Sequence, residues 1–299
     1  ELMVGRAVSL IEEKKSASAS PEPRLLIKDL FVGRPNGTLA VNDLDLEVHG
    51  GEIVCIAGVQ GNGQTELAEA LLGVTPALKG TIELDGKRLT GLTPRETIDA
   101  GLGFVPEDRK QDGCVGTFTV AENLILNHHD EHPYARGIAL NLSKVKQNAA
   151  HRISEFDIRT QSIEATVSSL SGGNQQKVVL ARELSRTLAL LVACQPTRGL
   201  DVGAIEFVHK RLVEERDRGT AVVIVSTELD EVIALADRIA VMYRGRIVGM
   251  VPPNTSREVL GLMMAGVPTE EALASASMTT LAEEDAALEA SLEKVPRES

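Results

Sequence analysis

The chain has 299 residues, and its 31 Lys and Arg against 43 Asp and Glu give a formal net charge of −12. This acidity argues against a general nucleic-acid binder, which needs clustered Lys and Arg to neutralise phosphates. Apolar residues make up 43% of the sequence, but no apolar run approaches the ~20 residues of a membrane helix. The three cysteines (Cys55, Cys114 and Cys194) are scattered and odd in number, which indicates buried, reduced thiols in the cytoplasm and not a disulfide framework.

The first 23 residues predict a junction between two units, in keeping with a length of about two domains. The hexamer Glu1–Arg6 shares Leu and Met positions with Gly261–Gly266. This similarity indicates an internal repeat, in which residues 1–6 end a preceding unit. Residues 7–23 contain the small-residue and proline tract Ser16–Pro23, which predicts a linker.

From residue 24 to residue 266 the pattern is strand-rich at first and then alternates strand and helix. Continuous apolar strands of this kind are typical of a parallel sheet that is buried on both faces. The predicted strands are Glu52–Ala57, Leu188–Ala193, Ala221–Val225 and Arg238–Met242, and the predicted helices that follow two of them are Thr65–Leu72 and Glu228–Ala236.

Two further regions differ from this pattern. Between about residues 115 and 166 the strands disappear and helix-favouring residues take over, as in Ser143–Phe156, which predicts an inserted helical subdomain. Residues 267–299 hold eight acidic and two basic residues and lack a strong apolar stripe, which predicts a disordered or weakly helical acidic tail.

The strongest local signal is a glycine-rich turn between a predicted strand and a predicted helix. Its spacing matches the phosphate-binding loop G-x-x-x-x-G-K-[ST], but Gln64 replaces the lysine. Thr65 is placed to hold Mg²⁺, as a weak site. The alternative is a turn that needs glycine for backbone reasons only. The residues expected to contact a nucleotide are Gly58, Gly61, Asn62, Gly63, Gln64, Thr65 and Glu66.

A second motif, Leu170–Lys177, reads LSGGNQQK and precedes a helical pattern. With this motif the chain resembles the ATP-binding cassette family, whose signature is LSGG followed by Gln or, in sugar and nucleoside importers, by NQQK. The segment Pro196–Ala204, with Asp201, is similar to the D-loop of that subgroup, and Pro106–Lys110 with Ala121–Leu124 is similar to its Q-loop region. The resemblance implies an α/β cassette with an N-terminal antiparallel β subdomain and an inserted helical subdomain. The signature residues are Leu170, Ser171, Gly172, Gly173, Asn174 and Gln175.

The chain departs from the family at the positions that carry catalysis. Cys194 and Gln195 stand where the family has an Asp for Mg²⁺ and a Glu that activates water, and neither replacement supplies a carboxylate. Thr227 stands at the position of the switch histidine, and Glu107 at that of the Q-loop glutamine. No aromatic partner for adenine is evident in Phe31–Leu39. Together with Gln64, these positions predict little hydrolysis and weak binding of ATP and Mg²⁺ at this site.

The resemblance implies two cassettes that enclose ATP head to tail, each site combining one phosphate loop with the signature of the other domain. We therefore expect this signature to act in trans on the first nucleotide-binding domain of the same polypeptide. The expected partners are permease subunits and, indirectly, a solute-binding protein, with no nucleic acid, at the cytoplasmic face of the plasma membrane. Its loops are closer to nucleoside than to pentose importers. The alternatives are a soluble cassette of translation or DNA repair and a regulatory nucleotide sensor.

Two other features have competing interpretations. The polar run Asn127–His132 could hold a metal, but ligands this closely spaced are more typical of a solvated loop. Cys194 could be a nucleophile, but its place at the end of an apolar strand predicts an inert thiol.

Overall fold

The computed structural model describes residues 14–275. The apolar runs of the sequence form two main sheets that share a hydrophobic core with helix α1 (Gln64–Leu72). The larger sheet has six strands in the order β12-β11-β3-β10-β9-β6, all parallel except β12. These strands are β3 (Ile53–Ala57), β6 (Leu102–Val105), β9 (Leu190–Cys194), β10 (Ala221–Ser226), β11 (Arg238–Tyr243) and β12 (Arg246–Val251). The four predicted strands are therefore confirmed.

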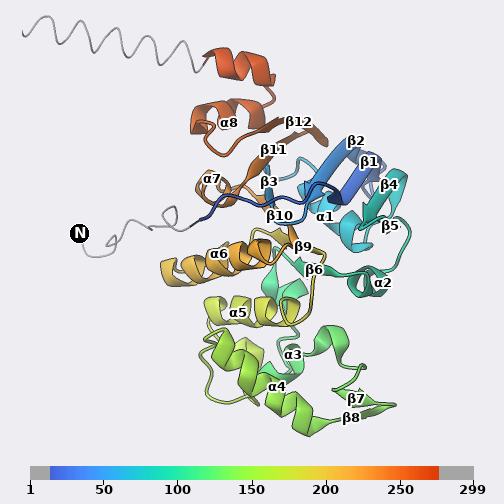
Figure 1. The fold of residues 1–299 in the computed structure, drawn as a ribbon, viewed down its shortest axis with the longest axis vertical. Coiled ribbons are helices and arrows are strands. Elements are labelled where there is room, and N and C mark those ends of the chain that lie inside the picture. The colour runs from blue at the N-terminus through green and yellow to red at the C-terminus, as the bar shows by residue number, and fades with distance from the viewer. Residues whose placement is uncertain (1–13, 276–299) are drawn as a thin grey trace, which may run out of the picture.

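The smaller sheet is antiparallel, in the order β2-β1-β4-β5. Its strands are β1 (Pro23–Gly33), β2 (Leu39–His49), β4 (Ala77–Leu84) and β5 (Lys87–Arg88). It lies beside the larger sheet in Figure 1, with helix α1 (Gln64–Leu72) next to it. The antiparallel β subdomain implied by the resemblance is thus present.

Both faces of the central sheet are buried, which explains its unbroken apolar strands. Val54 and Ile56 of β3 pack toward the antiparallel sheet and α1, whereas Cys55 and Ala57 pack toward the helices of the opposite face. The helices besides α1 are α2 (Pro94–Asp99), α3 (Val120–Asn123), α4 (Leu142–Glu155), α5 (Gly172–Glu183), α6 (Val202–Asp217), α7 (Leu229–Leu235) and α8 (Arg257–Met264).

The inserted region forms one end of the molecule, where α3 and α4 pack beside α5, while α8 lies at the other end (Figure 1). A short hairpin of β7 (Ala135–Arg136) and β8 (Ala139–Leu140) projects from this region. The expectation that strands are absent here is wrong, because the local turn at Gly137, with φ of +65°, lets two short segments pair.

Both ends of the described chain contact the rest of the fold. In the predicted linker, Lys14 forms an ion pair of 2.8 Å with Asp237, and Arg216 donates to the Lys15 carbonyl. In the predicted acidic tail, residues 269–275 are helical, and Ala272 is fully buried. The predicted end of a preceding unit, at residues 1–6, lies outside the described residues. So does the tail beyond residue 275.

Helices within residues 14–275 are all too short or too polar to cross a bilayer.

Candidate functional site

The parallel register places the predicted site residues along one edge of the central sheet. Ala57 of β3 is paired with Ser226 of β10, and Val225 of β10 with Cys194 of β9. The residues that follow these strands are therefore Gly58, Thr227 and Gln195, respectively, which emerge at the same edge. The carboxyl edge of a parallel sheet is the usual place for a ligand site.

The phosphate loop is a glycine turn that leads directly into α1. Gly63 caps this helix with φ of +108°, and a Cβ atom there would collide with the Ala40 carbonyl. Gly61 has φ of +90° with open space where a Cβ would be. Both conformations favour glycine. The loop therefore presents an open backbone at the N-terminus of α1, where N–H groups attract an anion.

Gln64 does not reach toward a ligand in this structure. Its side chain is buried, turns back under the loop and donates to the Val59 carbonyl at 3.2 Å. The hydroxyl-bearing Thr65 is instead exposed in the first helical turn. Thr65 is thus accessible to a cation, while the position of the missing lysine carries no charge.

The loop is anchored on two sides by residues that are distant in sequence. Asn62 accepts a hydrogen bond from Arg244 N–H at 3.0 Å, and its carbonyl accepts one from Gly245 at 2.8 Å. On the other side, Arg34 forms an ion pair of 2.6 Å with Glu66 and donates to the Gly61 carbonyl at 2.9 Å. Sequence reasoning missed Arg34, because only the fold brings the β1–β2 turn to this loop.

Two of the positions predicted to be substituted catalytic residues contact each other. Gln195 lies at φ of +46°, and its side-chain amide donates to the Thr227 hydroxyl at 3.3 Å. The Thr227 N–H donates to Oε1 of Gln195 at the same distance. The amide and hydroxyl can therefore orient a water molecule, but neither is a base at neutral pH.

Cys194 is buried at the end of β9, and burial raises the pKa of its thiol to about 12, with smaller contributions from Glu107 and Glu69. A protonated, buried thiol is neither a nucleophile nor an oxygen ligand for Mg²⁺. This environment supports the inert interpretation.

Glu107, at the predicted Q-loop position, contacts the predicted D-loop segment. Its carboxylate pairs with Arg198, whose carbonyl accepts a hydrogen bond from Arg109 at 2.8 Å. The guanidinium of Arg109 also lies against the signature, since a Cβ on Gly172 would approach its Nη2 to 2.6 Å. The Q-loop region, the D-loop region and the signature are thus joined within this chain.

The signature forms the N-terminus of α5, and each of its polar residues has a partner. Ser171 caps the helix, the side chain of Asn174 accepts from Arg159 N–H at 2.8 Å, and Gln175 donates to the Leu170 carbonyl at 3.1 Å. Gly173 lies close to the D-loop, with the Asp201 Oδ2 atom 3.7 Å from a Cβ placed there. Asp201 itself caps α6. The signature and the D-loop therefore meet, whereas the phosphate-loop glycines line neither pocket beside the signature.

A buried polar cluster lies behind the D-loop and was not predicted. Glu231 of α7 accepts hydrogen bonds from Thr197 at 2.7 Å and from His209 of α6 at 3.1 Å. All three side chains are less than 9% exposed. The cluster joins the start of the D-loop to the helix after Thr227, and no local signal could reveal it, because its members come from three separate segments.

The polar run at Asn127–His132 is distributed among different neighbours. Asp130 and Glu131 both pair with Arg95, and Asn127 donates to Glu183. Within residues 14–275, no group of three or more His, Cys, Asp or Glu side chains is arranged to hold a metal.

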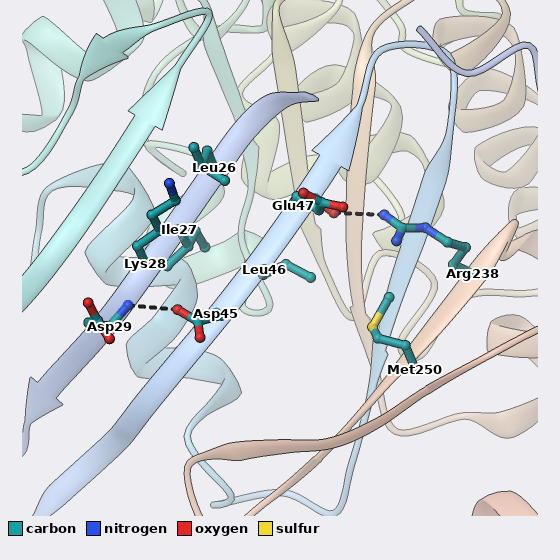
Figure 2. Close-up of a pocket in the computed structure, with 9 residues that line it drawn as sticks. All are labelled: Leu26, Ile27, Lys28, Asp29, Asp45, Leu46, Glu47, Arg238 and Met250. Atoms are coloured by element: carbon teal, nitrogen blue, oxygen red, sulfur yellow. Dashed lines mark hydrogen bonds between the residues drawn. The ribbon is translucent and has the colours of Figure 1, made fainter. Parts of the chain in front are cut away.

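One hollow of the surface lies away from these motifs. Figure 2 shows it along the outer face of β1 and β2, with Arg238 and Met250 at its side. Asp29 N–H donates to Asp45, and Arg238 donates to the Glu47 carbonyl, so its polar groups mainly contact one another. None of the residues predicted to bind a nucleotide lines it.

Comparisons with known proteins agree with the resemblance. A family model described as ABC transporter matches residues 41–198. The nucleoside import ATP-binding protein NupA of Lactococcus lactis is 48% identical over 268 residues, which cover 89% of this chain and 53% of that protein. The guanosine import ATP-binding protein NupO of Bacillus subtilis is 47% identical over 91% of this chain and 53% of its own length. The chain thus spans about half the length of these relatives.

Solved structures show the same fold. The post-hydrolysis dimer of the ATP-binding cassette MJ0796, bound to ADP and Pi, superposes with a TM-score of 0.67 at 20% identity, covering 78% of this chain and 100% of that chain. The ADP conformation of the cassette MJ1267 gives the same TM-score at 20% identity, covering 84% and 98%.

Proposed function

Because this chain belongs to the ABC transporter family, we propose that it is the second nucleotide-binding domain of a two-domain import ATPase. In this role it supplies its signature to the ATP site of the first domain, while its own site is impaired in hydrolysis. The observation that carries the proposal is an asymmetry: the signature Ser171–Gln175 keeps its residues, and each of its polar side chains makes at least one hydrogen bond, whereas Gln64, Cys194, Gln195 and Thr227 lack the charges and bases of hydrolysis.

The residues present fit the phosphates of ATP better than they fit a tightly held Mg²⁺ ion. The open backbone at Gly61 and the N-terminus of α1 can receive phosphate oxygens, and the exposed Thr65 hydroxyl can donate one ligand to Mg²⁺. Bound Mg²⁺ would neutralise charge on the phosphates. Cys194 cannot supply the second, carboxylate-based contact, which supports weak rather than tight binding.

Hydrolysis requires a group that takes a proton from the attacking water. Gln195 and Thr227 can hold a water molecule between amide and hydroxyl, but they leave its proton in place. Loss of such a base lowers the rate of hydrolysis by a factor of about 10²–10⁴. The site can therefore bind and position a nucleotide without turning it over efficiently.

The signature has the features of a site that acts on another domain. Gly172 and Gly173 keep the helix N-terminus free of side chains, and the Ser171 hydroxyl can donate to a phosphate oxygen. The relatives that match this chain are about twice its length, which supports a partner domain within one polypeptide. Their names refer to import of a nucleoside and of guanosine, which supports a nucleoside as the solute.

In this proposal the protein works at the cytoplasmic face of the membrane, bound to permease subunits that determine the path of the solute. A solute-binding protein acts through the permease and does not contact this chain. Nucleic acid is not a partner, in keeping with the net charge of −12.

The test is binding and turnover of Mg·ATP by the 299-residue chain. We expect weak binding and no turnover above the rate without protein. Turnover by this chain alone would contradict the proposal, because it would mean that the four substituted positions are tolerated.

Membrane coupling needs a separate measurement. Pull-down of the tagged chain with its co-expressed permease should recover an integral membrane protein. Recovery of ribosomes or DNA instead would favour the soluble class of cassette.

A further inference from the structure

The phosphate loop contains no positively charged side chain of its own to attract a phosphate. Residues 58–67 contain no Lys or Arg, and Glu66 places a carboxylate in the first turn of α1. A carboxylate at this position repels a phosphate at the same helix terminus, and it offsets the partial positive charge of the helix. Without a further cation, the loop is a poor site for a nucleoside triphosphate.

Arg34 brings a cation to this point from the turn that follows β1. Its Nε atom pairs with Glu66 at 2.6 Å, its Nη2 donates to the Gly61 carbonyl at 2.9 Å, and its Nη1 donates to the Leu39 carbonyl at 3.4 Å. The guanidinium therefore links the phosphate loop, the first turn of α1 and the β1–β2 turn. The planar, permanently charged group of arginine suits such a multiple contact.

The position of Arg34 is fixed by the turn itself. Its N–H donates to the Thr38 carbonyl at 2.8 Å, and its carbonyl accepts from Gly37, so the backbone closes a short loop. The side chains of the ion pair with Glu66 are 28% and 21% exposed. This partial burial screens the charges less than a fully exposed pair would be screened.

We propose that Arg34 is a residue of the nucleotide site, where it neutralises the carboxylate of Glu66 that would otherwise repel a phosphate. It also holds the Gly61 carbonyl by a hydrogen bond, and it leaves the amide groups and the helix terminus free to attract the anion. The ligand class is a magnesium-bound nucleoside triphosphate. This inference rests on the nucleotide site of the proposed function.

The experiment titrates the 299-residue chain with Mg·ATP by calorimetry. Arg34→Ala should weaken binding at least tenfold, and Arg34→Gln, which keeps hydrogen-bond donors without the charge, should weaken it nearly as much. Arg24→Ala is the matched control, because Arg24 lies at the start of the same strand and pairs with Asp85 at 3.0 Å, among residues unconnected to the loop. It should leave affinity within twofold of the unmodified chain.

Removing the repulsion should reverse the loss. Glu66→Gln alone should bind Mg·ATP as tightly as the unmodified chain or more tightly, and the double variant Arg34→Ala/Glu66→Gln should regain most of the affinity. Thermal unfolding of each variant checks that the fold is kept. Equal affinity of Arg34→Gln and the unmodified chain would overturn the inference.

The outcomes for this inference and for the proposed function differ. If the unmodified chain shows no binding at millimolar Mg·ATP, the inference fails, while the role of the signature in trans stands. If the chain hydrolyses ATP and Arg34→Ala still weakens binding, the inference stands and the impaired site of the proposed function fails.

Discussion

The phosphate loop and the signature are both glycine-rich turns that lead into a helix. They differ in whether the side chains of the motif, as well as its backbone, are retained. In the phosphate loop the backbone is intact, with Gly63 as a left-handed cap, but the buried Gln64 side chain is turned away. In the signature both the backbone and the residue types of the motif are kept, with Ser171 capping α5. The difference indicates that a fold holds its loop geometry even where the charged groups of catalysis have been replaced.

The largest expected effect tests the signature. In the two-domain protein of the proposed function, Ser171→Trp should lower ATPase activity by about 10²-fold or more, because a bulky residue blocks close approach of a phosphate to the helix terminus. Ser256→Trp is the control, since Ser256 is also an exposed helix cap and has no role in the site. Gln64→Ala should change activity by less than about threefold. Reversed effects in a steady-state ATPase assay would place the working site in this domain.

The next effect concerns the backbone of the phosphate loop. Gly63→Ala should lower the free energy of unfolding by about 3 kcal/mol, because its Cβ meets the Ala40 carbonyl and its φ is unfavourable. Gly61→Ala shares the positive φ but has open space, and should cost only about 1–2 kcal/mol. Urea unfolding measures both. If both variants lost the same free energy of unfolding, the positive φ angle, and not the contact with the Ala40 carbonyl, would explain why glycine is required.

Breaking one hydrogen bond of the buried cluster behind the D-loop should lower the free energy of unfolding by less than Gly63→Ala does. Thr197→Val removes the hydrogen bond to Glu231 at constant shape and should cost about 1–3 kcal/mol of unfolding free energy. Thr160→Val removes a hydrogen bond at the surface, to the Ser162 carbonyl, and should cost less than about 0.5 kcal/mol. Chemical denaturation of the two variants would contradict this prediction if Thr197→Val were as stable as its control.

The smallest effect is a pH dependence in the helical region. Burial, and then the positive charge of Arg186, lower the pKa of His128 to about 4 from 6.5. The unfolded chain therefore binds a proton as pH falls below about 6.5 while the folded chain does not, so stability decreases between pH 6.5 and 4. Because the His128 side chain is partly exposed, the free energy of unfolding should decrease by only about 1 kcal/mol from pH 7 to pH 5.

His128→Phe keeps the ring contact with Tyr134, whose centroid lies 5.0 Å away, and should remove this loss. His151→Phe, at an exposed position of α4, should leave the pH dependence unchanged. Denaturation at the two pH values would exclude His128 as the source if both variants lost the same stability.

The sequence by itself determined the architecture of the central sheet. Continuous apolar strands must be covered on both faces, and the strands β3, β9, β10 and β11 are the runs from which a buried parallel sheet was predicted. Gln195 and Thr227, predicted as substituted catalytic positions, contact each other at the carboxyl edge of this sheet. They do so because each follows one of two neighbouring parallel strands, β9 and β10.

Only the tertiary structure decided which distant side chains complete these motifs. Arg34 contacts Glu66 across 32 positions of sequence, and Thr197 and His209 meet on Glu231, because sheets and helices pack these segments together. Local patterns encode periodicity and turn geometry, which depend on near neighbours. The pairing of charges and hydrogen bonds between elements depends on how those elements pack, and a single sequence does not reveal it.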